Sequence, residues 1–157
     1  YQLLIDIKTD VEPALTLLIE KLKKFPDVFD PSVNPNAIRV VISGNRPSPS
    51  GFRNYPQFIF FDGKLNTKYD SNQLEQIALF SENMKKFTTW NGRSSMPEKE
   101  ESRLKHVIDS IHHINKKIRF WNAPDTISSW NTLMKLKVDY INTDKTLELA
   151  KFLNTNK

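Results

Sequence analysis

The sequence contains no cysteine and few of the motifs on which common cofactor and metal sites depend. Without cysteine it forms no disulfide bond, thiolate metal site or cysteine nucleophile. Its four glycines make neither a G-x-G-x-x-G fingerprint nor a Walker A loop, and it has no G-x-S-x-G elbow. His-Glu-x-x-His is absent as well. The sequence therefore argues against Rossmann cofactor sites, P-loops, nucleophile elbows and zincin sites.

Long apolar runs and strong charge are also missing. No apolar run approaches the ~20 residues of a membrane span, and no signal-peptide pattern is visible. The net charge is +5, from 23 Lys+Arg against 18 Asp+Glu. The cations are scattered and do not alternate with aromatic residues, so nucleic acid is not an expected partner. A basic nucleic-acid-binding module stays an alternative that rests on charge alone, and a steep fall of affinity with salt would identify it.

Apolar patterning predicts an α/β protein in which strands alternate with helices, and the length of 157 residues fits one domain. The expected strands are 3–8, 37–43, 58–61, 117–121 and 138–141. The expected helices are 11–25, a stretch from about 71 to 80, an irregular or helical piece over 81–90, and 98–115, 126–136 and 145–153. This alternation favours right-handed βαβ units and a parallel sheet.

Polar or charged residues stand where each predicted strand ends. Asp6 and Lys8 alternate onto one face of the first strand. Further polar residues follow the other strands, at 43–46, 62, 121–125 and 142–144. Parallel strands bring their carboxyl ends to one rim, which is where ligands bind in α/β folds. Loops are polar for ordinary reasons too, but five strands ending this way favour a ligand-binding rim.

Five segments of the chain resemble phospholipase-C-like phosphodiesterases, which include glycerophosphodiester phosphodiesterases and phosphatidylinositol-specific phospholipases C. The segments are Leu4–Thr9, Val41–Pro47, Trp90–Gly92, Ile118–Asp125 and Val138–Asp144. The likeness is greatest to a bacterial branch often labelled alkaline phosphatase. It implies that residues 1–157 are the C-terminal part of one TIM (β/α)8 barrel, strands four to eight with their helices. Asn115 and Lys137 stand at turn positions where the family commonly has glycine.

The resemblance implies a divalent-metal-dependent phosphoric diester hydrolase acting on a glycerophosphodiester- or phospholipid-like substrate. Asp6 matches a ligand of one divalent cation, Ca²⁺ or Mg²⁺, and Lys8 matches the lysine that contacts the phosphate. An Asp–Lys pair packed inside a barrel is the alternative for these two residues. The family's acid and base histidines are expected upstream of Tyr1, so no catalytic residue is expected in this chain, which we expect to be inactive alone.

Arg46, Arg119 and Trp121 are further candidates for substrate binding. The alternative for Arg46 is an ordinary surface arginine, the alternative for Arg119 is an ion pair with a carboxylate, and the alternative for Trp121 is packing in the core. The expected partner is a phosphodiester small molecule or a phospholipid head group. Open barrel edges are expected to favour self-association. Members of the family that the chain resembles are often exported from bacteria, and no compartment is predicted for this protein. A non-catalytic remnant of the same barrel that binds phosphate or sugar is the competing hypothesis.

Overall fold

A computed structural model describes residues 1–155 and divides the chain into two compact units, Tyr1–Ala78 and Leu79–Lys157. The first unit contains β1 (Gln2–Ile7), α1 (Val11–Leu22), α2 (Pro26–Phe29), β2 (Arg39–Gly44), the 3-10 helix η1 (Pro49–Asn54), β3 (Ile59–Gly63) and α3 (Ser71–Glu75). β4 (Ile77–Asn83) begins in the last two residues of the first unit and continues into the second. The second unit continues with η2 (Met84–Lys86), α4 (Glu98–His113), β5 (Lys117–Trp121), α5 (Ile127–Lys135), β6 (Tyr140–Ile141) and α6 (Thr146–Thr155).

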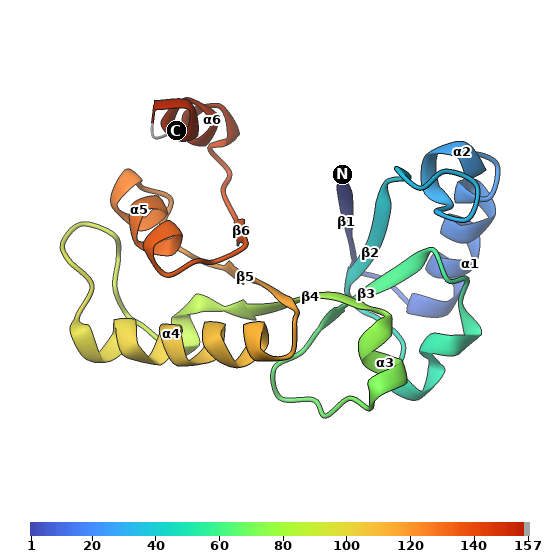
Figure 1. Cartoon of the computed structure of the whole chain (residues 1–157), viewed down its shortest axis with the longest axis horizontal. Helices are drawn as coiled ribbons and strands as arrows, with labels where there is room; N and C mark the ends of the chain where they lie inside the picture. Colours follow the sequence, from blue (N-terminus) through green and yellow to red (C-terminus); the bar gives the residue numbers. More distant parts are fainter. Residues whose placement is uncertain (156–157) are drawn as a thin grey trace. The chain divides into compact units, whose positions relative to one another are not determined.

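In the first unit, three parallel strands lie in the order of the chain, and α1 follows the first of them (Figure 1). β1 pairs with β2 from Gln2 opposite Arg39 to Ile7 opposite Gly44. Alternate residues of β2 and β3 form an apolar core with α1 and η1. Its fully buried members are Leu15, Val40, Ile42, Ile59 and Phe61, and Phe52 of η1 stacks on Phe61 at 4.0 Å. The apolar stripe predicted to run to Phe25 ends earlier, because α1 stops at Leu22 and Phe25 is 58% exposed.

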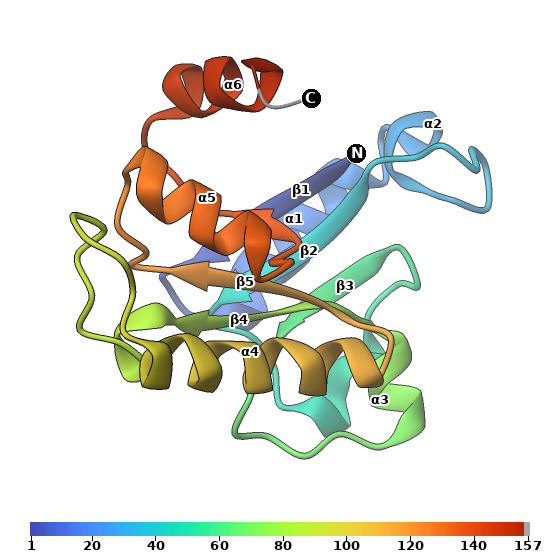
Figure 2. The same cartoon turned by 60° about the vertical axis from the view of Figure 1, so that its left-hand side comes forward.

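In the second unit, β4, β5 and β6 are also parallel and in chain order, and α4 runs beside β4 and β5 (Figure 2). Leu104 and Ile108 of α4 are fully buried, as are Ile118 and Phe120 of β5. α5 and α6 complete the core of the second unit through a contact between two aromatic side chains. Trp130 of α5 packs on Phe152 of α6 with ring centroids 5.5 Å apart. Asn115 has a positive φ of 55°, as expected of the residue that terminates the helix before β5.

The α/β class and the parallel strands are confirmed, and each unit is consistent with consecutive β/α units of a TIM-type barrel. The prediction of a helix from about Ser71 to residue 80 is wrong. The helix ends at Glu75, and Ile77–Asn83 is a strand whose first four residues are all buried. Residues 1–155 therefore contain six strands where five were predicted, and the numbering of the strands as four to eight is not confirmed. No helix within residues 1–155 is long and apolar enough to cross a bilayer.

Candidate functional site

The carboxyl ends of β1, β2 and β3 carry three neighbouring polar side chains in the first unit. Asp6 lies opposite Ser43 in the register of β1 and β2. The Ser43 hydroxyl donates a hydrogen bond of 2.7 Å to Oδ2 of Asp62 at the end of β3. By strand alternation, Ser43 and Asp62 lie on the face opposite to the core residues Ile42 and Phe61. A polar row therefore crosses three strands at the rim where ligands bind in α/β folds.

Two cations lie beside these carboxylates. Lys8 Nζ is 2.7 Å from Asp6 Oδ2, and the two side chains are 78% and 51% exposed. Because both groups are well solvated, this pair contributes no more than about 1 kcal/mol to stability. Arg46 is different, since its side chain is only 10% exposed and its Nη1 lies 4.0 Å from Oδ2 of the buried Asp62. Arg46 is therefore not the ordinary surface arginine that the sequence left open.

Gly44 allows Asp6 to lie close to the end of β2. Its φ is +70°, and a Cβ placed there would be 2.1 Å from Oδ1 of Asp6 and 2.4 Å from the carbonyl oxygen of Ile7. Only glycine fits such a backbone and such a contact. The position of the Asp6 carboxylate thus depends on a residue of the neighbouring strand.

The described residues near Asp6 offer few side-chain ligands for a divalent cation. Within residues 1–155, no group of three or more histidine, aspartate or glutamate side chains is placed to hold a metal ion. Asp6 offers one carboxylate, and Lys8 already contacts one of its oxygens. Ca²⁺ takes about six to eight oxygen ligands, and Mg²⁺ demands a near-octahedral set. A cation bound to Asp6 would therefore need several further oxygen ligands beside this carboxylate.

In the second unit, Arg119 of β5 is held between two neutral oxygen acceptors, Ser81 on β4 and Asn142, which directly follows β6. Its Nε and Nη2 donate to Oδ1 of Asn142 at 3.0 and 2.7 Å, and its Nη1 donates to the Ser81 hydroxyl at 3.2 Å. These contacts fix the guanidinium plane without a carboxylate among them. A guanidinium group fixed in this way is suited to an anionic ligand.

Trp121 lies two residues further along β5, on the same face as Arg119. It is opposite Asn83 of β4 and is 40% exposed. The alternative of a core tryptophan is therefore wrong for Trp121. An exposed aromatic ring at the rim can form a wall for a ligand, so Trp121 stays a candidate for substrate binding.

Asp125 joins two rim loops and was missed as a site residue in the sequence. Its Oδ1 accepts hydrogen bonds from the Trp130 indole N–H at 3.1 Å and the Thr143 hydroxyl at 2.5 Å. Its Oδ2 accepts from the backbone N–H of Asp144 at 2.9 Å. Burial alone would raise the pKa of Asp125, but the hydrogen bonds from Thr143, Asp144, Trp130 and Lys145 outweigh it and lower this pKa below 3.8. Asp125 is therefore a structural carboxylate that supports the rim.

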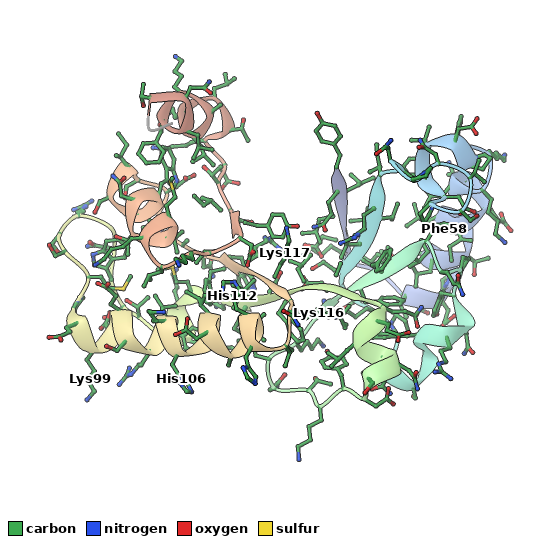
Figure 3. The ribbon with its side chains drawn as sticks, in the orientation of Figure 1. Phe58, Lys99, His106, His112, Lys116 and Lys117 are labelled. Atoms are coloured by element: carbon green, nitrogen blue, oxygen red, sulfur yellow. The ribbon has the colours of Figure 1, made fainter. Side chains whose placement is uncertain are left out.

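The three histidines of the chain all lie on α4 and not at strand ends. Lys99 and His106 project outward from the helix (Figure 3). His112 Nε2 is 2.9 Å from Oδ2 of Asp139, which also accepts the backbone N–H of Ile118 at the start of β5. This contact ties the end of α4 to the amino end of a strand, which is the stability side of such folds. No strand end within the described residues carries a histidine.

The sequence model of the glycerophosphoryl diester phosphodiesterase family matches residues 117–146, about a fifth of the chain. The matched segment runs from β5 through β6 and includes Arg119 and Trp121, whereas Asp6, Lys8 and Arg46 lie outside it. The match supports a relationship with the phospholipase-C-like phosphodiesterases. No curated protein and no solved structure matches the chain.

Proposed function

We propose that this chain is the C-terminal part of a phosphoric diester hydrolase that acts on glycerophosphodiester- or phospholipid-like substrates. The observation that carries the proposal is the family match over residues 117–146, which contain a fixed arginine and an exposed tryptophan on one strand. The match points to a glycerophosphodiester phosphodiesterase-like function. The rim of the first unit adds further cations of the kind that such chemistry uses.

Lys8, Arg46, Arg119 and Trp121 are proposed to contact the substrate. A phosphodiester carries one negative charge, and charge develops on its non-bridging oxygens when the phosphorus is attacked. N–H donors fixed before the reaction stabilise that charge without reorganising. Arg119 is fixed by neutral acceptors, and Arg46 is held in a nearly buried position. Lys8 is exposed and free to exchange its contact with Asp6 for one with phosphate.

Asp6 is proposed as one ligand of a divalent cation, Ca²⁺ or Mg²⁺, whose other ligands lie outside residues 1–155. When bound, such a cation supplies positive charge at the phosphate oxygens. The general acid and base are likewise proposed to lie outside this chain, since its histidines are on α4. The chain alone is therefore expected to hydrolyse no phosphodiester.

The first experiment reads the coding sequence upstream of Tyr1 for about a hundred codons. A continuous frame with two histidines and acidic partners would allow the extended protein to be tested on glycerophosphodiesters with Ca²⁺ or Mg²⁺. There, Asp6→Asn and Arg46→Gln should each lower kcat/KM by roughly 100- to 1,000-fold, the cost of losing one charge-stabilising group. Asp109→Asn and Lys99→Gln, on α4, are matched controls that should retain activity. An extended protein that cleaves no diester, or an Asp6→Asn variant with full activity, would refute the proposal.

The second candidate is a non-catalytic protein that binds phosphate or sugar at the same rim. It is favoured by the absence of histidine from every described strand end. Binding of dimethyl phosphate to the chain, weakened by Arg119→Gln, without hydrolysis by the extended protein would select this candidate.

A further inference from the structure

The short helices η1 and α3 lie side by side in the first unit (Figure 1), and residues from both segments line a cavity of about 590 Å³. This volume falls within the ~300–1,000 Å³ that is typical of small-molecule sites. The lining residues are Arg53, Tyr55, Gln57, Asn72, Glu75 and Gln76. Tyr55 and Gln57 come shortly before β3 begins, whereas Asp62 and the candidate rim are at the carboxyl end of this strand. The cavity is therefore separate from the candidate site described above.

The backbone around the cavity is held in place by hydrogen bonds. Gln76 donates from Nε2 to the carbonyl oxygen of Phe52 at 3.1 Å, and its own carbonyl oxygen accepts the backbone N–H of Phe61 at 2.8 Å. The Tyr55 hydroxyl donates to Oε1 of Glu12 at 2.8 Å. These contacts tie α3 to η1 and to β3, and they tie the loop after η1 to α1. A ligand would not have to order this backbone on binding, which lowers the entropic cost.

Two side chains of opposite charge line the cavity, and neither has a partner. Arg53 and Glu75 are both exposed, and within residues 1–155 neither side chain makes a hydrogen bond or an ion pair. A guanidinium group can bind a carboxylate through two parallel N–H donors, and a carboxylate can accept hydrogen bonds from an ammonium group. A ligand that carries both a carboxylate and an ammonium group would therefore find a partner for each, whereas a ligand of one charge would find only one.

Neutral amides complete the polar lining. The side chains of Gln57 and Asn72 are exposed and have no hydrogen-bond partner within the described residues. Gln76 uses only its Nε2, so its Oε1 is free to accept. A primary amide presents donors and acceptors together, and a peptide group likewise presents one N–H and one carbonyl oxygen. The cavity thus offers a peptide group complementary hydrogen-bonding partners in addition to the two charges.

We propose that this cavity binds a short peptide with free ends, of about dipeptide size. Arg53 contacts the carboxylate of the ligand, Glu75 contacts its ammonium group, and the amides of Gln57 and Asn72 contact the peptide group between them. The inference does not depend on the proposed function, because all of these residues lie in the first unit and none of them is at the rim. Hydrolysis of a diester by the extended protein neither requires nor excludes it.

The test is a titration of the ¹⁵N-labelled chain of 157 residues, followed by NMR at the side-chain amides of Gln57 and Asn72. The ligands are alanyl-alanine, its N-acetyl form, its C-terminal amide and 5-aminopentanoate. Acetylation removes the ammonium charge, and amidation removes the carboxylate. The fourth ligand carries both charges at a spacing close to that of a dipeptide but has no peptide group.

Alanyl-alanine should shift both probes with a dissociation constant on the order of 1 mM. Each of the other three ligands lacks one polar contact and should bind at least about fivefold more weakly. Absence of saturable shifts with alanyl-alanine, or equal affinity for its two capped forms, would overturn the proposal. Equal affinity for 5-aminopentanoate would show that the peptide group is not recognised, which would overturn the assignment to a peptide.

Variants assign each charge of the ligand to its partner. Arg53→Gln should weaken alanyl-alanine at least about fivefold and should not weaken the C-terminal amide, which has no carboxylate to lose a contact. Glu75→Gln should likewise weaken alanyl-alanine and should not weaken the N-acetyl form. Lys21→Gln and Glu20→Gln remove the same charges from α1, outside the cavity, and should leave all affinities unchanged. Equal loss for the free and the matching capped dipeptide, or an equal effect of a control, would contradict the assigned contacts.

Discussion

Removal of the Asp125 carboxylate should destabilise the rim of the second unit measurably. Asp125 accepts hydrogen bonds from Trp130, Thr143 and the backbone of Asp144, and so joins the loop after β5 to the loop after β6. Asp125→Ala leaves all three donors without this acceptor. Trp130 is only 2% exposed, so its indole N–H cannot recover a water partner easily.

The expected loss follows from the hydrogen bonds removed. One buried donor left unsatisfied costs about 1–3 kcal/mol, and loss of bonds to a charged acceptor adds to this, so we expect Asp125→Ala to cost about 3 kcal/mol. In a chain of this length, that lowers Tm by roughly 6–12 °C. Asp125→Asn retains one oxygen acceptor and should cost about half as much. Asp109→Ala removes an exposed contact with Lys105 and, as the control, should cost no more than about 0.5 kcal/mol.

The pH dependence of Tm provides a second readout. Because the native pKa of Asp125 is lowered below 3.8, the unfolded chain takes up the proton first as the pH falls. The stability from this carboxylate is thus present in full above the ordinary aspartate range and is lost as the pH falls through the native pKa. The difference in Tm between wild type and Asp125→Asn, measured by circular dichroism, should shrink below about pH 4.

Two results would refute this reasoning. Asp125→Ala could unfold within 1 °C of the Asp109→Ala control, which would mean that the three donors find equivalent partners elsewhere. Alternatively, the difference between wild type and Asp125→Asn could stay constant from pH 6 to pH 3, which would mean that the native carboxylate is not preferentially ionised.

Two further predictions concern the first unit. Gly44→Ala should lower the free energy of unfolding in urea by at least about 2 kcal/mol, because the φ of Gly44 is positive and the new Cβ meets Asp6. The control Gly51→Ala, where the new Cβ has no neighbour nearer than 3.8 Å, should change this free energy by less than about 1 kcal/mol. Equal effects of the two substitutions would contradict the strain assigned to position 44. Burial, helped by the hydrogen bond to Glu12, raises the pKa of Tyr55 to about 12. Tyr55 should therefore be the source of a late tyrosine titration in absorbance at 295 nm. Its contribution to stability should be lost as the pH rises from 10 through 12. If Tyr55→Phe left the spectrum above pH 11 unchanged, this prediction would be refuted.

The strands that are rich in β-branched residues, or that are short apolar runs between turn residues, were predictable from the sequence. Strand β4 was not. Leu74, Ile77 and Phe80 recur at intervals of three, which favoured a helix over the whole segment. The Asp70–Gln73 capping box does start a helix, but only for five residues. The four consecutive buried residues from Ile77 to Phe80 are instead typical of a strand buried on both faces. Periodicity alone does not separate these two cases over so short a run.

The candidate site was predictable as residue types at strand ends but not as contacts. The pairing of Asp6 with Lys8 followed from alternation along one strand. The contact of Ser43 with Asp62 joins residues 19 positions apart, and it depends on the register between β2 and β3. Likewise, Arg119 reaches Asn142 only because β5 and β6 are neighbours. Register is set by packing of the whole core, so a single-sequence pattern contains little information about it.

Strand order in each unit repeats the order of synthesis. During translation, β2 emerges when β1 is already outside the ribosome, and β3 emerges when β2 is available to receive it. The same holds for β4, β5 and β6. Within residues 1–155, each strand after the first of its unit pairs with the strand that was made just before it, so its exposed apolar surface is short-lived. Vectorial growth of this kind favours cotranslational folding and limits the time in which unpaired strands are open to aggregation.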